Sequence, residues 1–173
     1  TKSMGITGFY PFVASQVPEC VYYTDVFPSR FSTVIVDVFY EMHRWLYIIS
    51  KEFFDHCDDA LIAALPSLPH TPTDSPWRRE VSEKLAQHIV DKFLAFPVPA
   101  LFVFDGPHKL PKVTRTSSAK KYAEKIRQET DVAMIRRYAP YTVTLNDDDI
   151  RMVQSRAETF FIPCYQANDE GEK

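Results

Sequence analysis

Two uninterrupted apolar runs in the chain each end on an aspartate. Ala100 to Phe104 leads without alternation into Asp105 and Gly106, and Thr33 to Val36 leads into Asp37. Runs of this kind predict strands buried on both faces, as in a parallel sheet. Because the carboxyl ends of parallel strands meet in one crevice, we expect the two aspartates to be neighbours. The competing interpretation is that each aspartate caps the helix or turn that follows it.

Helical periodicity follows both strands. A stripe of apolar residues from Met42 to Phe53 predicts an amphipathic helix directly after Asp37. His43 is off this stripe and is therefore expected at the surface or near the crevice. A second apolar stripe, from Val81 to Phe93, predicts another helix. The four prolines between Leu65 and Pro76 predict a surface loop between these helices. Residues 118–137 are compatible with an exposed or bridging helix that has little core to join. Asn146 begins a further helix with three aspartates in its first turn. The order predicts an α/β fold with a mainly parallel central sheet flanked by helices.

The composition favours one soluble domain. The chain has 173 residues, 45% of them hydrophobic, and it contains neither an apolar stretch of membrane-spanning length nor a signal-peptide core. Three cysteines without close spacing predict neither a disulfide framework nor a zinc site. We therefore expect a single domain over residues 1–173, in an intracellular protein that does not enter a membrane.

Charge is distributed unevenly. The net charge is −3, yet residues 107–127 carry seven basic side chains and one acidic one, while residues 146–173 carry seven acidic and three basic ones. A basic strip beside an acidic cluster suits a polyanion held next to metal ions, although two solvated faces of opposite charge are the simpler alternative.

Four carboxylates are candidates for a metal site. Glu170 and Glu172 lie two residues apart at an expected helix start that follows a third short apolar run, Phe160 to Tyr165. Together with Asp37 and Asp105 they would place more negative charge at one edge of the sheet than could stay ionised without cations. Hard divalent ions with oxygen ligands, Mg²⁺ or Mn²⁺, fit such a site, and a two-ion site of this kind hydrolyses phosphodiester bonds.

Four motifs, in order and at suitable spacing, resemble those of the flap endonuclease/XPG family of structure-specific 5′ nucleases. They are Met4-Gly-Ile-Thr-Gly-Phe, Val34-Ile-Val-Asp37, Phe102-Val-Phe-Asp-Gly106 and Ile162-Pro-Cys-Tyr-Gln-Ala-Asn-Asp-Glu-Gly-Glu172. The resemblance implies a PIN-like fold, metal binding by Asp37, Asp105, Glu170 and Glu172, and a basic helical arch over residues 107–137. It implies that Lys112 contacts the scissile phosphate and that the strip binds nucleic acid through Lys109, Lys112, Arg115, Lys120, Lys121 and Lys125.

The function that we expect from this resemblance is Mg²⁺- or Mn²⁺-dependent hydrolysis of flapped or branched DNA, or of RNA. Because the family's site also uses aspartates that would follow Lys173, we expect the domain to be incomplete; His43 stands where the family has an aromatic residue that stacks on a base. The alternative is a catalytically inactive relative that binds nucleic acid or protein as a scaffold in post-transcriptional regulation. A haloacid-type phosphatase fits less well, because no second acid stands two residues after Asp37 or Asp105. The nucleus is the expected location, with the cytoplasm or mitochondrion as alternatives.

Overall fold

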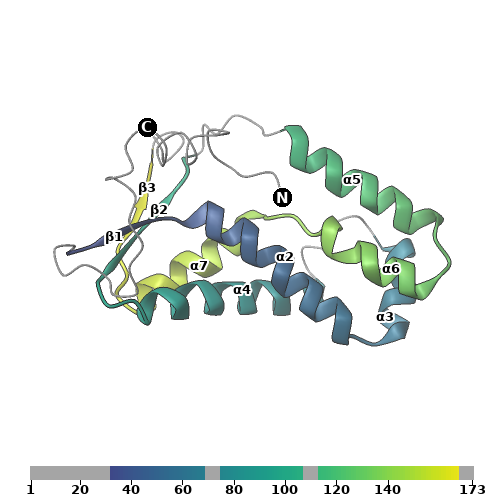
Figure 1. Ribbon diagram of the computed structural model, residues 1–173, viewed down its shortest axis with the longest axis horizontal. Helices are drawn as coiled ribbons and strands as arrows, with labels where there is room; N and C mark the ends of the chain where they lie inside the picture. The colour runs from purple at the N-terminus through teal and green to yellow at the C-terminus, as the bar shows by residue number, and fades with distance from the viewer. Residues whose placement is uncertain (1–31, 69–74, 107–112, 168–173) are drawn as a thin grey trace, which may run out of the picture. The chain divides into compact units, whose positions relative to one another are not determined.

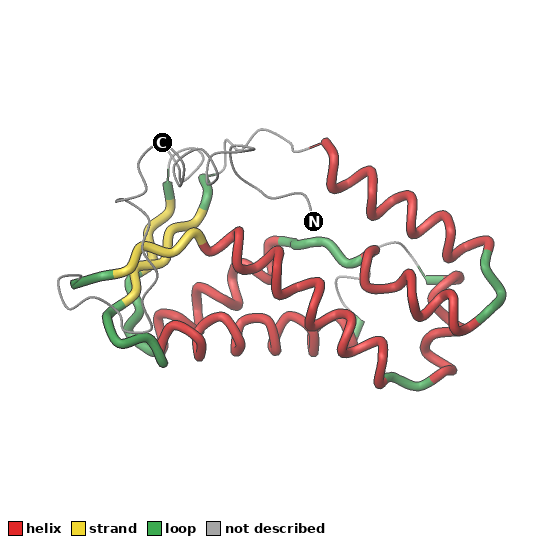
Figure 2. The backbone as a smooth tube through the Cα atoms, in the orientation of Figure 1, coloured by secondary structure: helices red, strands yellow, loops and turns green. Residues whose placement is uncertain are grey.

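The computed structural model describes residues 32–68, 75–106 and 113–167, with side chains of the last range described from Ser118 onward. The chain divides into two compact units, residues 1–31 and 32–173, and every described residue belongs to the second. This unit is a mixed α/β structure in which helix predominates (Figures 1 and 2). Its strands are β1 (Val34–Asp37), β2 (Ala100–Phe104) and β3 (Cys164–Gln166). Its helices are α2 (Val38–His56), α3 (Asp59–Ala64), α4 (Pro76–Leu94), α5 (Val113–Gln128), α6 (Val132–Tyr138) and α7 (Asp147–Thr159), with 3₁₀ turns η2 (Leu65–Ser67) and η3 (Ala139–Thr142).

The three strands form one parallel sheet in the order β1-β2-β3. Val34 lies opposite Ala100 and Asp37 lies opposite Val103, while Phe102 and Phe104 lie opposite Cys164 and Gln166. The predicted parallel arrangement of the first two strands is therefore confirmed. Long helical crossovers join the strands, as parallel pairing requires.

Local capping sets most of the helix starts. The side chains of Asp37, Asp58, Ser75 and Asp131 each accept a hydrogen bond from a backbone N–H in the first turn of the helix that follows. Asn146 caps α7 in a reciprocal pair with Asp149, whose carboxylate accepts from the Asn146 N–H. The predicted helix start at Asn146 is confirmed.

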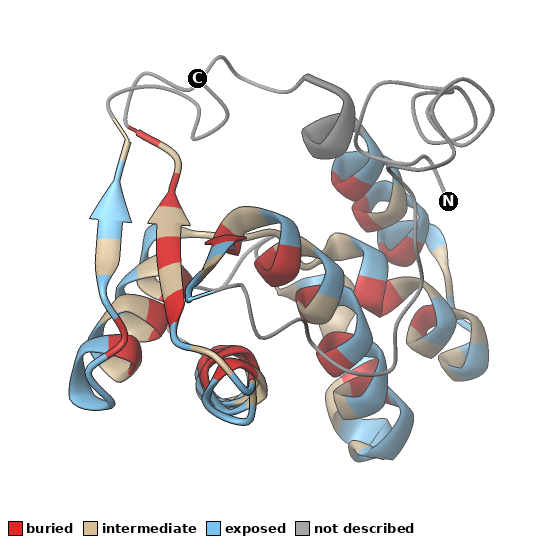
Figure 3. Cartoon of the chain, turned by 60° about the vertical axis from the view of Figure 1, so that its left-hand side comes forward, coloured by how far each residue is buried: buried red, intermediate tan, exposed pale blue. Residues whose placement is uncertain are grey.

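Two clusters of buried side chains hold the unit together. In the first, Val36, Phe102 and Phe104 on one face of the sheet pack with the apolar sides of α2, α4 and α7. The second joins Phe54 and Ile62 to Ile126 of α5 and Ile135 of α6. Figure 3 shows these buried positions on the helix sides that face one another, with exposed residues on the outer turns.

The prediction that both apolar runs are buried on both faces is wrong. Burial alternates along β2, where Phe102 and Phe104 are buried but Leu101 and Val103 are only half-buried. In β1, Ile35 is 71% exposed. The reason is that the helices of the first cluster pack on a single face of the sheet, so the periodicity of side chains in a strand gives one buried set and one partly exposed set.

The prediction of one exposed helix over residues 118–137 is also wrong. The helix ends at Gln128, and α6 begins after Asp131, which caps it. Ala119, Ala123 and Ile126 of α5 are buried, so the small apolar content of this stretch does join a core. The sequence analysis also missed α3, which is only six residues long.

Among the described helices, none combines the length and apolar character needed to cross a membrane. Cys57 and Cys164 are not joined in a disulfide, and burial raises the pKa of both thiols. Cys20 lies outside the described residues.

Candidate functional site at the carboxyl edge of the sheet

Two of the four predicted carboxylates lie at one edge of the sheet. Asp37 is the last residue of β1, and Asp105 directly follows the last residue of β2. The strands are adjacent and parallel, and Asp37 lies opposite Val103, two residues before Asp105. The carboxyl ends of the two strands therefore deliver both side chains to the same edge.

Asp37 has a structural role at this edge. Its side-chain Oδ1 accepts a hydrogen bond of 3.1 Å from the backbone N–H of Tyr40, and this contact caps α2. The side chain remains exposed. The competing interpretation, that the aspartate caps a helix, is thus correct for Asp37, but a carboxylate has a second oxygen and further lone pairs that a single cap does not use.

Asp105 lies deeper, since it is half-buried and is followed by the buried Gly106. The strand ladder continues beside it, because the N–H of Ala167 donates to the carbonyl of Phe104 over 2.9 Å. Ala167 is three residues before Glu170. Glu170 and Glu172 themselves lie outside the described residues, so their convergence with the aspartates stays a prediction.

The donor chemistry at this edge fits a hard divalent cation, because carboxylate oxygens from adjacent strands are the ligands that Mg²⁺ and Mn²⁺ prefer. Within residues 32–68, 75–106 and 113–167, no group of three or more histidine, cysteine, aspartate or glutamate side chains is placed to hold a metal ion. Asp37 and Asp105 by themselves therefore do not form such a group. The predicted set would be completed by Glu170 and Glu172.

The predicted basic residues are only partly described. Lys109 and Lys112 lie outside the described residues, and Arg115 belongs to the first turn of α5, where side chains are not described. Lys120, Lys121 and Lys125 are exposed on α5. Lys121 and Lys125, four residues apart, share a face of the helix.

Four tyrosines that the sequence analysis did not single out converge from four elements. The ring centroid of Tyr141 in η3 is 5.0 Å from that of Tyr47 in α2 and 4.5 Å from that of Tyr122 in α5. The ring centroid of Tyr138 in α6 is 5.7 Å from that of Tyr122. The Tyr47 hydroxyl donates a hydrogen bond of 3.0 Å to the Tyr141 hydroxyl. This bond, together with partial burial, raises the pKa of Tyr47 to about 12. The only sequence signal was the position of Tyr122 among lysines.

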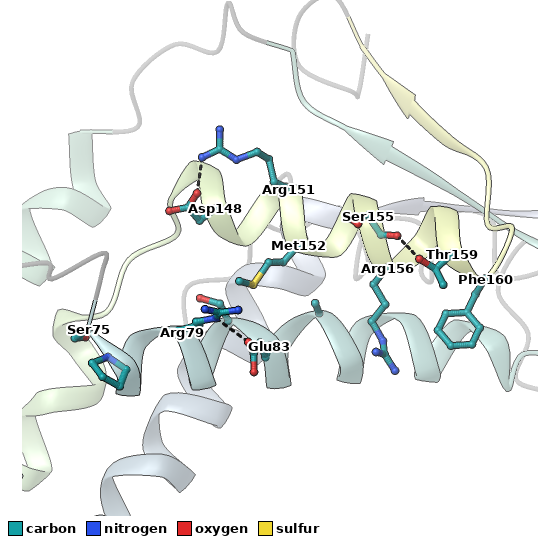
Figure 4. A pocket seen from close by; sticks show the side chains of 13 residues that line it. Ser75, Arg79, Glu83, Asp148, Arg151, Met152, Ser155, Arg156, Thr159 and Phe160 are labelled. Atoms are coloured by element: carbon teal, nitrogen blue, oxygen red, sulfur yellow. Dashed lines mark hydrogen bonds and ion pairs between the residues drawn. The ribbon is translucent and has the colours of Figure 1, made fainter.

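A groove of about 990 Å³ lies between α4 and α7 (Figure 4). Met152 points from α7 toward α4 in its centre, and Arg156 also points toward α4, whereas Arg151 points away toward Asp148. Its arginines pair with acids: Arg79 with Glu83 at 2.9 Å, Arg156 with Asp91 at 3.1 Å, and Arg151 with Asp148. Because these charges are compensated within the protein, the groove offers no net charge to an ionic ligand.

Beneath this groove, Arg78 and Asp149 form a buried ion pair that joins α4 to α7. The Ser82 hydroxyl donates to Asp149 over 2.7 Å, and Arg78 also donates to the Thr144 carbonyl over 3.1 Å. These partners satisfy both charges inside the core, so we assign the pair a structural role.

The sequence matches no protein-family model, and it matches no curated protein. The functional proposal therefore depends on the sequence motifs and on the geometry of the carboxyl edge.

Proposed function

We propose that the chain forms part of a Mg²⁺- or Mn²⁺-dependent, structure-specific 5′ nuclease of PIN-like fold that hydrolyses phosphodiester bonds in flapped or branched DNA, with RNA as the other substrate class. The observation that carries the proposal is the placement of Asp37 and Asp105 at the ends of adjacent parallel strands. The four motifs that resemble the flap endonuclease/XPG family support it. An intracellular, nuclear location belongs to the same proposal.

In this proposal Asp37, Asp105, Glu170 and Glu172 hold the metal ions. Bound divalent ions supply activation of a water molecule and stabilisation of the leaving oxygen. The protein's own contribution is to fix the carboxylates: the cap on α2 orients Asp37, and the partly buried end of β2 positions Asp105. The lysines of residues 107–127 hold the phosphates of the substrate, and Lys112 contacts the scissile phosphate.

The second candidate is a catalytically inactive relative that binds nucleic acid or a protein as a scaffold. The observation that favours it is the hydrogen bond from the Tyr40 N–H to Asp37, which gives this aspartate a structural role that requires no metal. The two candidates differ in one respect that can be measured. A nuclease requires charge on both aspartates, whereas a scaffold requires only a folded edge.

The deciding experiment compares the wild-type protein with the Asp105→Asn variant. A 5′-flap duplex is incubated in Mg²⁺ or Mn²⁺ and the products are resolved by length, while binding is measured separately in EDTA. We expect cleavage by Asp105→Asn to fall by orders of magnitude with little change in binding, because metal ions stabilise charge that develops in the transition state. Asp55→Asn, an exposed aspartate near the other end of α2, is the matched control and should cleave as the wild type does.

Two results would contradict the nuclease. The first is a wild-type protein that binds flap, gapped and single-stranded substrates of DNA and RNA but cleaves none of them, which would support the scaffold. The second is undiminished cleavage by Asp105→Asn, which would remove the carboxyl edge of the sheet from the chemistry.

A further inference from the structure

The four converging tyrosines form a surface that we call the tyrosine platform: Tyr47, Tyr122, Tyr138 and Tyr141. Tyr122 and Tyr141 are stacked, with an interplanar angle of 18° and centroids 4.5 Å apart. Tyr47 and Tyr141 remain 37% and 42% exposed, whereas Tyr122 and Tyr138 are half-buried. The inner pair thus supports the outer pair, whose rings are partly available to a ligand.

One cationic side chain lies directly on this platform. The Lys125 ammonium is 5.2 Å from the centroid of Tyr122 and 5.1 Å from that of Tyr138. These distances are within the range of attraction between a cation and an aromatic ring. Lys121 lies one turn earlier on the same face of α5 and is exposed. Positive charge therefore lies against Tyr122, the ring that stacks on the exposed Tyr141.

A row of exposed aromatic and basic side chains connects the platform with the carboxyl edge. Tyr40, Arg44, Tyr47 and Lys51 are exposed at spacings of four, three and four residues, which places them on one side of α2. Asp37 begins this row, because it caps the same helix. At 1.5 Å per residue, Tyr47 lies about 15 Å along the helix axis from Asp37. Figure 1 shows how α2, α5 and α6 are arranged in space.

Packing alone does not account for the exposed pair. A tyrosine that only fills a core is buried, yet Tyr47 and Tyr141 each keep more than a third of the residue surface in water. Their hydroxyls hydrogen-bond to each other, which holds both rings in place before any ligand arrives. A preformed aromatic surface loses little conformational entropy on binding.

We propose that the tyrosine platform binds single-stranded nucleic acid, with unpaired bases stacking on Tyr47 and Tyr141 and with Lys121 and Lys125 neutralising the adjacent phosphates. The inference rests on the proposed function, to which it adds a binding surface for the unpaired strand. Single strands fit better than duplex, because only unpaired bases present a free face to an aromatic ring. Every base has such a face, so the surface should tolerate any sequence.

The test compares two fluorescent strands of equal length and charge, an oligothymidine and an abasic phosphodiester, by anisotropy in EDTA. The wild-type protein should prefer oligothymidine. Replacing both outer rings, Tyr47→Ala with Tyr141→Ala, should weaken oligothymidine binding by about 5- to 150-fold per stacked base, with little effect on the abasic strand. Phe161→Ala removes an exposed aromatic residue outside the platform and is the matched control.

The conservative double variant, Tyr47→Phe with Tyr141→Phe, keeps both rings and should keep the base-dependent binding that the double alanine variant loses. Three results would overturn the platform: equal affinity of the wild type for both strands, equal losses for both strands in the double alanine variant, or loss of base-dependent binding in the double phenylalanine variant. Because the assay contains no metal and measures no cleavage, its failure is distinct from failure of the nuclease. Base-dependent binding without any cleavage would support the platform and contradict the nuclease.

Discussion

The buried ion pair between α4 and α7 makes a strong prediction about stability. Asp149 is 0% exposed, and its carboxylate accepts from three donors: the Arg78 guanidinium, the Ser82 hydroxyl at 2.7 Å and the Asn146 N–H at 2.9 Å. Asp149→Ala removes all three hydrogen bonds at once. It leaves the guanidinium of Arg78, whose side chain is 3% exposed, without its counter-charge.

The expected cost follows from that burial. Removing one partner of a buried, hydrogen-bonded pair costs about 3–5 kcal/mol, mainly because the remaining charge is left uncompensated. Since a chain of this size loses about 2–4 °C of Tm per kcal/mol, Asp149→Ala should lower the Tm by roughly 6–20 °C. The loss should appear in thermal melts and in urea unfolding alike.

The neighbouring residue supplies the control. Asp148 pairs with Arg151 on the surface, where both side chains are exposed, so Asp148→Ala should leave the Tm nearly unchanged. If Asp148→Ala and Asp149→Ala shift the Tm equally, the buried pair does not stabilise the packing of α4 against α7. Replacing the pair with apolar side chains, Arg78→Met with Asp149→Leu, should be less destabilising than Asp149→Ala alone, because no buried charge is left unpaired.

Three further predictions concern single features. Lys120→Ala with Lys121→Ala should reduce the salt dependence of single-strand binding by about 0.7 of a slope unit for each phosphate that these lysines neutralise, and an unchanged slope would exclude them from the phosphate path. Tyr141→Phe should lower the pKa of Tyr47 from about 12 toward 10.0 in a tyrosinate absorbance titration, since the hydroxyl hydrogen bond is the largest cause of the raised value. Because the folded-state pKa of Tyr47 is the higher one, the stabilisation from Tyr47 should be complete below pH 10 and decline as the pH rises toward 12; a Tyr47 that titrates near pH 10 in the wild-type protein would contradict this. Phe161→Gly should stabilise the protein by roughly 1 kcal/mol in urea unfolding, because the 93% exposed Phe161 has a φ of 58° at the end of α7, where glycine carries no steric cost; Phe161→Ala, which keeps that cost, should not.

Local patterns were sufficient for the parts of the fold that short segments determine. The apolar runs located β1 and β2, and the helical stripes located α2 and α4, because strand and helix periodicities are properties of a few consecutive residues. The acidic start of α7 was also predictable, since an asparagine cap followed by aspartates satisfies the exposed N–H groups of a helix end.

Features that depend on distant partners were not predictable in the same way. Asp149 was expected only as part of a helix start, and its burial depends on Arg78, 71 residues away in the sequence. The break between α5 and α6 brings Ile126 and Ile135 into one core with Phe54, an arrangement that no local pattern contains. The tyrosine platform likewise exists only after four elements have packed together.

For the candidate site, the sequence located the strand ends but could not establish what the side chains do there. Asp37 and Asp105 lie where the pattern predicted, at the ends of adjacent parallel strands. Glu170, Glu172, Lys109 and Lys112 lie outside the described residues, so their roles stay predictions. A metal site needs several ligands within a few ångströms, which strand order alone cannot specify.

Capping and metal binding by Asp37 are compatible, and the geometry gives a reason for combining them. The hydrogen bond from the Tyr40 N–H uses Oδ1 of Asp37, and a carboxylate has a second oxygen that can bind a cation. A ligand for a divalent cation must be held in one orientation, and the cap supplies this condition before any ion binds. The same cap begins the row of exposed side chains on α2 that leads to the tyrosine platform. A nucleic-acid strand that stacked its bases on the platform would thus be aligned along α2, whose first turn fixes the Asp37 carboxylate. In the proposed nuclease, α2 would then set the position of both the nucleic-acid strand and a metal ligand.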